Sequence, residues 1–471
     1  MFKNIAKLMG ISLMLSFSAF ASAQTPNELF TKPCIQVDPD FPYYQNRSWD
    51  SVAEEVAING FQQVAITGTS PKVLIPELIT ALKKKGLTVR CLYGPMNGYY
   101  VSQSKNLPEG WEKWRVTYAG TDPFPDIAFF CPNEPASLEW RKKEVTDALL
   151  AHPEIDIFDV GEIFYFGNLE PNLNYACVCQ RCVDKFTNAY PEEKNIPDFV
   201  NTKSIYYYKT NKELYKKWVE FRVDAAVKYQ NDIINGKGGI RELCPNVKIC
   251  TWNLGCSTPQ PDPVAAMREA EASDGAAIVK MCHPDSHCIQ TNAPDWTKVD
   301  LLPTYPKEYL PFLNAIKAVS PKLQVSMQTE IGSMFDMRRS RDWYKEFDKT
   351  AHEIGFTQTM GYMYCLFKDI AVEKPALMKA RLESDDRTIT LIFNKRLDAK
   401  KCQDKALYSI PGIQVEDIKV DGNLVVIKTK GASLGRSMFV EKAYDDPITR
   451  HFAAQLKVQN EAGPFKVMLL R

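Results

Sequence analysis

Between residues 34 and 367, short runs of apolar and β-branched residues alternate with longer segments in which apolar residues recur at helical spacing. The short runs are nearly continuous, as expected of parallel strands buried on both faces. The predicted strands are residues 34–38, 61–66, 87–92, 155–160, 247–252, 276–281, 323–329 and 356–360. The predicted helices are residues 51–59, 72–85, 135–151, 213–235, 263–272, 306–319 and 341–354. Eight strand–helix units predict an α/β fold, a (β/α)8 TIM barrel rather than an open sheet.

The pattern changes after residue 380, where short segments alternate apolar and polar positions and are separated by Asp-Gly, Pro-Gly and Gly-Pro turns. These strands are predicted at residues 388–393, 415–420, 424–428 and 465–469. We therefore expect a barrel over residues 24–375 and a small C-terminal β-sandwich over residues 381–471. Residues 391–397 and 408–412 resemble bacterial Ig-like modules, and this resemblance implies an accessory or spacer role.

The first residues are typical of a signal peptide. Lys3 and Lys7 precede an apolar run over residues 8–20, and a small-residue cleavage motif ends at Ala23. Cleavage after Ala23 would release a secreted or periplasmic protein, and an uncleaved anchor is the alternative. No later run is long and apolar enough to span a bilayer, so no membrane insertion is expected after cleavage.

The charges exclude one class of partner. The chain carries 58 Lys and Arg against 57 Asp and Glu, interspersed, for a net charge of +1. This pattern provides no basic surface for nucleic acid. The sequence does not indicate an oligomeric state. Thirteen cysteines in an exported protein predict disulfides by default.

Two glutamates follow predicted strands. In a (β/α)8 barrel the C-terminal ends of the strands form the mouth of the active site. Glu162 follows the fourth predicted strand and Glu330 follows the seventh. A facing pair of carboxyl groups can cleave a glycosidic bond, one as acid and the other as nucleophile when they lie about 5–5.5 Å apart. The pair therefore favours a retaining glycoside hydrolase acting on an oligo- or polysaccharide. The alternative for each glutamate is an acid that only binds or pairs with a base.

A stretch of about sixty residues is similar to a known family. Cys131-Pro-Asn-x-Pro135, the strand before Glu162 and Cys177-x-Cys179-x-x-Cys182 resemble the β-galactosidases of glycoside hydrolase family 42. The resemblance implies that Glu162 is the acid/base and Glu330 the nucleophile. It also implies a zinc site whose ligands are Cys131, Cys177, Cys179 and Cys182.

The sequence departs from that family in ways that indicate a divergent relative. The family's Asn before the acid/base is Gly161 here, and the large additional domains of typical members are missing. A site of four thiolates is closed and structural, so zinc would stabilise the fold and catalysis would need no cofactor. Disulfide pairing of the same cysteines is the competing interpretation.

Further polar and aromatic side chains are expected at the mouth of the barrel, where aromatic faces stack on sugars and polar groups bind hydroxyls. The predicted substrate-binding residues are Asp159, Trp252, Asn253, His283 and Tyr362.

Two alternatives to a glycosidase remain. His283, Asp285 and His287 lie close in sequence after the sixth predicted strand and could hold a metal, which would make the protein a metal-dependent hydrolase. The barrel could also be a glycan-binding protein without catalytic activity, a possibility that the departure at Gly161 allows.

Overall fold

The computed structural model describes residues 26–163, 165, 167, 173–257, 261–332, 335–451, 453 and 456–470. The predicted signal peptide over residues 1–23 lies outside the described residues.

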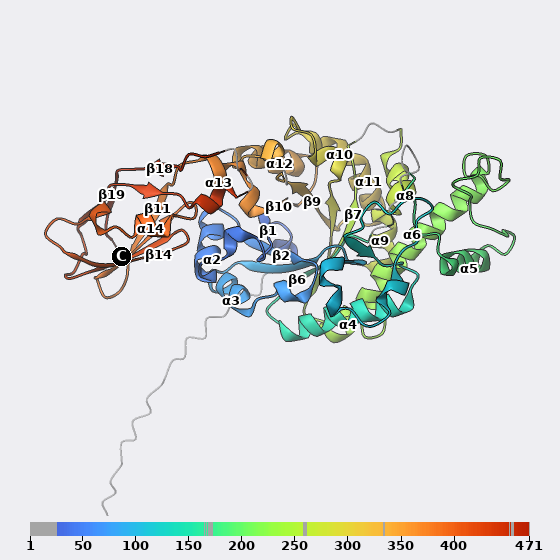
Figure 1. The fold of residues 1–471 in the computed structure, drawn as a ribbon, viewed down its shortest axis with the longest axis horizontal. Coiled ribbons are helices and arrows are strands. Elements are labelled where there is room, and N and C mark those ends of the chain that lie inside the picture. The colour runs from blue at the N-terminus through green and yellow to red at the C-terminus, as the bar shows by residue number, and fades with distance from the viewer. Residues whose placement is uncertain are drawn as a thin grey trace, which may run out of the picture.

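Eight parallel strands form a closed barrel around the centre of the molecule (Figure 1). In chain order they are β1 (Cys34–Val37), β2 (Gln63–Gly68), β3 (Thr88–Tyr93), β6 (Ile157–Val160), β7 (Lys248–Leu254), β8 (Ser286–Gln290), β9 (Gln324–Glu330) and β10 (Gln358–Tyr362). The barrel closes because β1 pairs with β2 on one side and with β10 on the other. The (β/α)8 prediction is confirmed.

Helices surround the barrel and bury its apolar outer surface. The longer ones are α2 (Trp49–Ile58), α3 (Pro76–Lys84), α4 (Pro135–Ala151), α5 (Gln180–Ala189), α6 (Lys212–Asn235), α8 (Pro263–Glu271), α9 (Gly275–Cys282), α11 (Leu310–Val319) and α12 (Arg341–Glu353). The short ones are α1 (Pro26–Leu29), α7 (Ile240–Leu243), α10 (Ala293–Trp296), α13 (Lys368–Val372) and α14 (Ala399–Cys402). Several begin at side-chain caps: Ser48 accepts from the Ser51 amide at α2, and Ser340 accepts from the Trp343 amide at α12.

The prediction for the sixth strand is wrong. Residues 276–281 belong to helix α9, and the sixth barrel strand is β8, about ten residues later. An unbroken apolar run of this length does not distinguish a buried strand from a buried helix. Asp274 favours the helix over a strand here, because its side chain caps α9 by accepting from the Ala277 amide.

The long connection between β3 and α4 forms part of the barrel mouth. It contains two short antiparallel strands, β4 (Gly98–Tyr100) and β5 (Ile127–Phe129). Tyr100 and Phe129 from this pair line the cavity described below. The connection therefore builds a wall above the strand ends.

The C-terminal region forms separate antiparallel sheets with a hydrophobic core of their own, at one end of the molecule (Figure 1). The four-stranded sheet contains, in spatial order, β11 (Leu377–Leu382), β12 (Thr388–Phe393), β15 (Leu424–Thr429) and β14 (Val415–Asp421). A second sheet contains β13 (Tyr408–Ser409), β16 (Ser437–Val440) and β19 (Phe465–Met468), and a third contains β17 (Ala443–Tyr444) and β18 (Glu461–Ala462). This arrangement is compatible with the predicted small β-domain, and the Ig-like likeness stays a prediction.

Two arginines join this region to the barrel. Arg47 pairs with Glu55 of α2 at 2.7 Å and donates to Asn423 Oδ1 at 3.1 Å. Arg396 donates to the main-chain oxygens of Tyr43 and Gln45 at 2.9 and 2.6 Å. These contacts attach the β-domain to the segment that follows β1.

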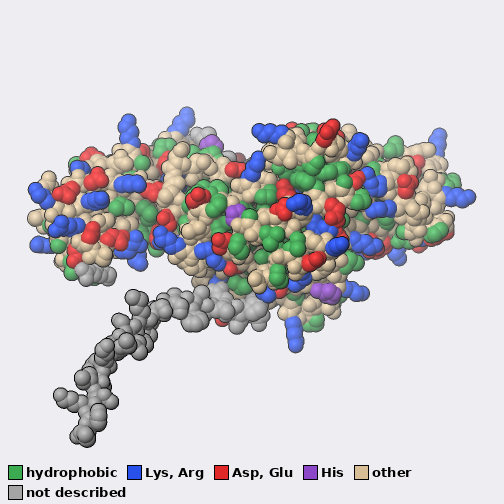
Figure 2. Space-filling view, turned by 90° about the horizontal axis from the view of Figure 1, so that it is seen from below, with side chains coloured by type: hydrophobic (Ala, Val, Ile, Leu, Met, Phe, Trp, Pro, Cys, Tyr) green, Lys and Arg blue, Asp and Glu red, His purple; other side chains and the backbone are tan. Residues whose placement is uncertain are grey.

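The surface carries both signs of charge. Figure 2 shows Lys and Arg interspersed with Asp and Glu over the face in view, in keeping with the balanced composition. Within the described residues, none of the helices has the length and apolar character needed to cross a bilayer.

Candidate active site

A cavity of about 700 Å³ lies at the C-terminal ends of the barrel strands. Glu162 and Glu330 both line it. Glu162 follows β6, the fourth strand of the barrel, and Glu330 ends β9, the seventh. The structure therefore brings the two predicted carboxyl groups to one cavity from strands separated by β7 and β8.

The loop after β6 holds Glu162 in an unusual backbone conformation. Its φ is +54°, in the left-handed region that glutamate rarely adopts, and residues held there often belong to functional sites. Its carbonyl accepts from the Met96 amide at 3.1 Å, and its Oε1 accepts from Gln290 Nε2 at 2.8 Å. Burial raises the pKa of the Glu162 carboxyl above its ordinary value, although the Gln290 hydrogen bond opposes the rise. A carboxyl with a raised pKa is suited to donate a proton near neutrality.

Two glycines make room around Glu162. A Cβ on Gly94 would collide with Glu162 Oε2, and a Cβ on Gly161 would lie 2.9 Å from Cγ of Trp252. Neither position can hold a side chain without moving Glu162 or the Trp252 ring. The glycine at position 161 therefore has a packing explanation.

Glu330 lies across the cavity from Glu162, three strands away around the barrel. Its side chain is 6% exposed, and its Oε1 accepts from the Gly332 amide at 3.2 Å. Tyr362, the residue opposite Glu330 in the β9–β10 pairing, also lines the cavity. Burial, followed by the charges of Glu330 and Asp38, raises the pKa of the Tyr362 hydroxyl, which keeps it a neutral hydrogen-bonding group.

The structure separates the five predicted substrate-binding residues. Trp252 and Tyr362 line the cavity, whereas Asp159, Asn253 and His283 do not. The placement of these three at the mouth is wrong.

Asp159 and Asn253 are committed to contacts within the protein. Asp159 is fully buried inside the barrel, where it pairs with Arg90 and accepts from Trp252 Nε1 at 2.8 Å. Asp159 lies within β6, three residues before Glu162, and therefore inside the barrel below the mouth. The oxygen of Asn253 lies 2.7 Å from His287 Nε2, between β7 and α9, so this side chain points away from the barrel interior.

The predicted metal constellation of His283, Asp285 and His287 lies at the wrong end of the barrel. Because β8 begins at Ser286, these residues precede the sixth strand or lie inside it. His283 is exposed at the end of α9, and Asp285 accepts from the Ile249 amide at 2.9 Å. Burial lowers the pKa of His287 to about 3, so that its ring stays neutral. This geometry removes the metal-dependent hydrolase interpretation.

Several polar residues that sequence reasoning missed also line the cavity. Among them are Asp38, which follows β1, Gln290, which ends β8, and Gln328, which lies two residues before the end of β9. All three could have been found by their positions along the strands. Burial raises the pKa of Asp38 to about 6. Glu271 also lines the cavity from the end of α8, a helix that gave no signal of this role. Burial raises the pKa of Glu271 to about 7, and nearby Arg222 only partly opposes the rise.

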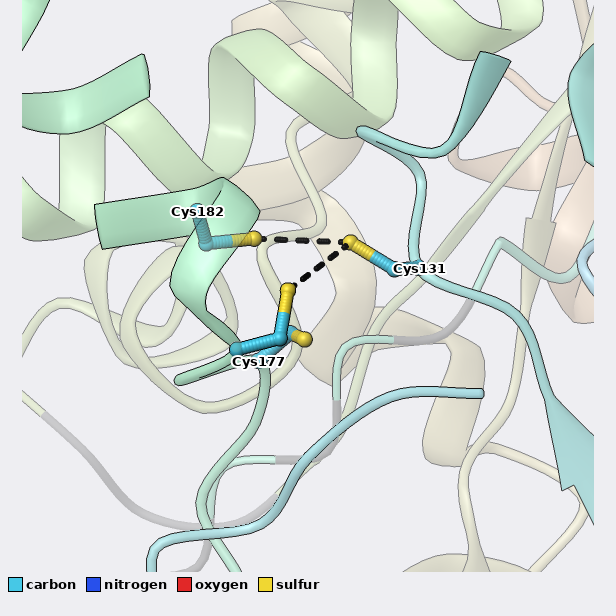
Figure 3. Close-up of side chains that lie close together, drawn as sticks. Cys131, Cys177 and Cys182 are labelled. Atoms are coloured by element: carbon cyan, nitrogen blue, oxygen red, sulfur yellow. Dashed lines mark hydrogen bonds between the residues drawn. The ribbon is translucent and has the colours of Figure 1, made fainter. Parts of the chain in front are cut away.

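The four predicted zinc ligands meet in one cluster beside the barrel (Figure 3). Cys131 precedes α4, Cys177 and Cys179 lie in the segment that leads into α5, and Cys182 lies in the first turn of α5. All four sulfur atoms lie within 4.8 Å of one another. The Cys131 sulfur lies 3.4 Å from that of Cys182 and 3.9 Å from that of Cys179.

These distances fit a tetrahedral zinc ion, whose sulfur ligands at about 2.3 Å would lie roughly 3.8 Å apart. Two donors outside the cluster also reach the sulfurs. The Thr117 amide donates to Cys177 Sγ at 3.3 Å, and Asn133 Nδ2 donates to Cys182 Sγ at 3.4 Å. Such N–H···S bonds stabilise thiolates and orient metal ligands.

All thirteen cysteines are free thiols in the structure, so the expectation of disulfides is wrong here. Most are buried, and several lie on barrel strands, where a thiol packs as a small apolar side chain. Cys34, Cys250 and Cys288 share one such cluster in the barrel interior.

No protein-family model and no curated protein sequence matches this chain. Among solved structures, the chain is similar to the β-galactosidase from Bacillus circulans sp. alkalophilus at 13% identity and a TM-score of 0.48, over 73% of this chain and 53% of that one. The β-galactosidase from Marinomonas ef1 is 14% identical with a TM-score of 0.47, over 71% and 54%. The endo-1,4-β-D-mannanase from Thermotoga petrophila RKU-1 is 12% identical with a TM-score of 0.39, over 71% and 88%.

The chain spans about half the length of those two β-galactosidases. Likenesses at this level of identity do not bear on activity, and the fold assignment rests on the closed strand order itself. Fold and site together define a (β/α)8 barrel with an acid-lined cavity at its mouth.

Proposed function

We propose that this protein is a retaining glycoside hydrolase that acts on an oligo- or polysaccharide. The observation that carries the proposal is that Glu162 and Glu330 line one cavity at the strand ends. The desolvated carboxyl of Glu162 supports its assignment as the acid, since a raised pKa favours the protonated form.

The reaction then takes two steps. Glu162 donates its proton to the glycosidic oxygen while a carboxylate oxygen of Glu330 bonds to the anomeric carbon and the leaving sugar departs. Glu162, now ionised, takes a proton from water, and the resulting hydroxide displaces Glu330 from the same carbon. Gln290 holds Glu162 Oε1 during both steps.

The walls of the cavity suit a sugar chain. Tyr100 and Phe124 line the cavity and are 41% and 39% exposed, whereas Trp252, also a lining residue, is only 1% exposed. Aromatic faces of this kind stack on the C–H faces of sugar rings. We expect the carbohydrate to enter over Tyr100 and Phe124 and to reach Trp252 at the bottom of the cavity.

Zinc and export belong to the same proposal. Cys131, Cys177, Cys179 and Cys182 would hold one structural zinc ion that fixes the segment before α5 to the start of α4. Because four thiolates leave no open position, the ion would take no part in hydrolysis. The protein would be exported through its predicted signal peptide and act in the periplasm or outside the cell.

Hydrolysis of a panel of neutral 4-nitrophenyl glycosides tests the function, with the anomer of the first product read by proton NMR. We expect retention of configuration and loss of turnover in the Glu162→Gln and Glu330→Gln variants, whereas Glu269→Gln, exposed on α8, keeps it. Azide should restore cleavage of an activated aryl glycoside by Glu162→Ala. Unchanged turnover in either glutamine variant refutes the assignment. Oligosaccharide binding without cleavage by the wild type would favour the non-catalytic alternative.

A further inference from the structure

The charged residues that line the described cavity are all acidic. Its acidic lining residues are Asp38, Asp40, Glu162, Glu271 and Glu330. Among the described lining residues, no lysine, arginine or histidine balances them. The proposed reaction uses only two of the five, so three carboxyl groups are left without a role in bond cleavage.

Those three acids form no ion pair with a basic residue that the structure describes. Asp38 accepts from the Asp40 amide at 3.0 Å, and neither side chain forms an ion pair with a described basic residue. Arg222 is the cation that acts most on Glu271, but it donates its hydrogen bonds to other acceptors, among them Tyr175 OH at 2.7 Å. These three carboxyl groups are therefore left without a cationic partner within the described protein, and a ligand can supply one.

Two buried acceptors in the same wall lack a donor. Oε2 of Glu271 and Oε1 of Gln328 are buried and accept no hydrogen bond in the described structure. Gln328 is only 5% exposed and lies two residues before Glu330 on β9, on the same face of the strand. Buried acceptors are nearly always paired in native proteins, so a missing partner points to a group that arrives with a ligand. That group must bring N–H or O–H donors.

Resting on the proposed glycosidase function, we propose that the substrate is an oligosaccharide of amino sugars with free, protonated amines. An ammonium group supplies three donors and a positive charge, which is what unpaired carboxylates and an unpaired amide oxygen require. Asp38 follows β1, whereas Glu271 follows β7 and ends α8, on the other side of the barrel. The two acids therefore meet amines on different sugar units, with Gln328 between them on β9. The same acidic residues would repel anionic sugars.

Three β-1,4-linked trimers that differ only at C2 provide the test: the glucosamine trimer, its N-acetylated form and cellotriose. Binding to the full-length protein is measured by calorimetry in 50 and 500 mM NaCl. We expect the glucosamine trimer to bind at least about tenfold more tightly than the other two at low salt. The advantage should shrink at high salt, because screening weakens the attraction between ammonium and carboxylate.

Variants locate the effect. Glu271→Gln and Asp38→Asn should each reduce the preference for the glucosamine trimer while leaving cellotriose binding within about twofold. Glu269→Gln, exposed two residues earlier on α8, is the matched control and should leave the preference unchanged.

The outcomes separate this proposal from the function on which it rests. Equal or weaker binding of the glucosamine trimer, or no measurable binding of any trimer, overturns the amine proposal. If neutral aryl glycosides are nevertheless hydrolysed, the glycosidase function stands. Tight binding of the amine trimer without cleavage of any glycoside supports the amine site and overturns the hydrolase function.

Discussion

Replacing Glu271 by glutamine should stabilise the protein at alkaline pH and leave its stability unchanged in acid. The change removes a charge and keeps the shape of the side chain. Burial raises the pKa of this carboxyl from 4.5 to about 7, so the folded protein favours its neutral form. A group whose pKa is raised on folding contributes stability below its unfolded pKa, and that stability is lost as the pH rises through the folded value.

The magnitude follows from the two pKa values. At about 1.36 kcal/mol for each pKa unit, the difference between 4.5 and about 7 corresponds to roughly 3 kcal/mol at pH 8.5. With an unfolding entropy of about 2.1 cal/mol/K per residue, a chain of 471 residues would gain roughly 3 °C in Tm. At pH 4 the wild type and the variant should differ by less than about 1 °C, because Glu271 is protonated in both the folded and unfolded wild type.

Thermal unfolding followed by circular dichroism at pH 4, 6 and 8.5 is the assay, with Glu269→Gln as the control. Glu269 is exposed, lies two residues earlier on the same helix and accepts from the Tyr215 hydroxyl at 2.9 Å. Because glutamine keeps an oxygen that can accept this hydrogen bond, its variant should follow the wild type at each pH. A Tm for Glu271→Gln that is equal to or below the wild type at pH 8.5 would refute the reasoning. It would mean that a basic group, such as Arg222, compensates the carboxylate more fully than its contacts indicate.

Three further predictions concern the glutamate loop and the cysteine cluster. Glu162→Gln should lower kcat for glycosides at least about 100-fold, and wild-type kcat should fall as the pH rises through the raised pKa of Glu162; a kcat that keeps rising at alkaline pH contradicts the acid role. Gly94→Ala should lower kcat up to about 100-fold with little change in Tm, because its Cβ displaces the Glu162 carboxylate, and wild-type kcat in this variant contradicts the geometry. Native mass spectrometry should find one zinc ion, which Cys177→Ser loses with a fall in Tm of roughly 5 °C or more, and a metal-free wild type contradicts the zinc site.

Much of the barrel was predictable because its local signals agree with its global fold. Seven of the eight predicted barrel strands overlap observed strands, and the helix predicted at residues 135–151 has those bounds. Pro135 occupies its first turn, and Glu134 caps it by accepting from the Ala136 amide. The sixth strand failed because its sequence, Ser286 to Gln290, contains polar residues, whereas the preceding helix is more apolar.

The residues that line the candidate site were predictable only where their placement follows from strand position. Glu162 and Glu330 were found because they follow or end strands, and this position places a side chain at the mouth. The sequence does not show whether a strand residue reaches the mouth or stays inside the barrel. Asp159 lies three residues before Glu162, and its carboxylate is paired with Arg90, a residue far away in the chain. Glu271 was missed because a residue that ends a helix reaches the cavity only through the packing of α8 against its neighbours.

The contacts around Glu162 explain why position 161 carries a glycine. If position 161 carried an asparagine, its Cβ would collide with the Trp252 ring, which is 1% exposed and held by its hydrogen bond to Asp159. The Trp252 ring therefore excludes any residue larger than glycine at position 161. The ring cannot move aside because it is hydrogen-bonded to Asp159, which is in turn paired with Arg90. The buried Arg90–Asp159 ion pair holds the Trp252 ring in place, and the ring leaves no room for a side chain at position 161. Gly161 directly precedes Glu162, whose left-handed backbone conformation directs its side chain to the cavity. Gly161 is therefore part of the support of Glu162, the residue that we propose as the acid.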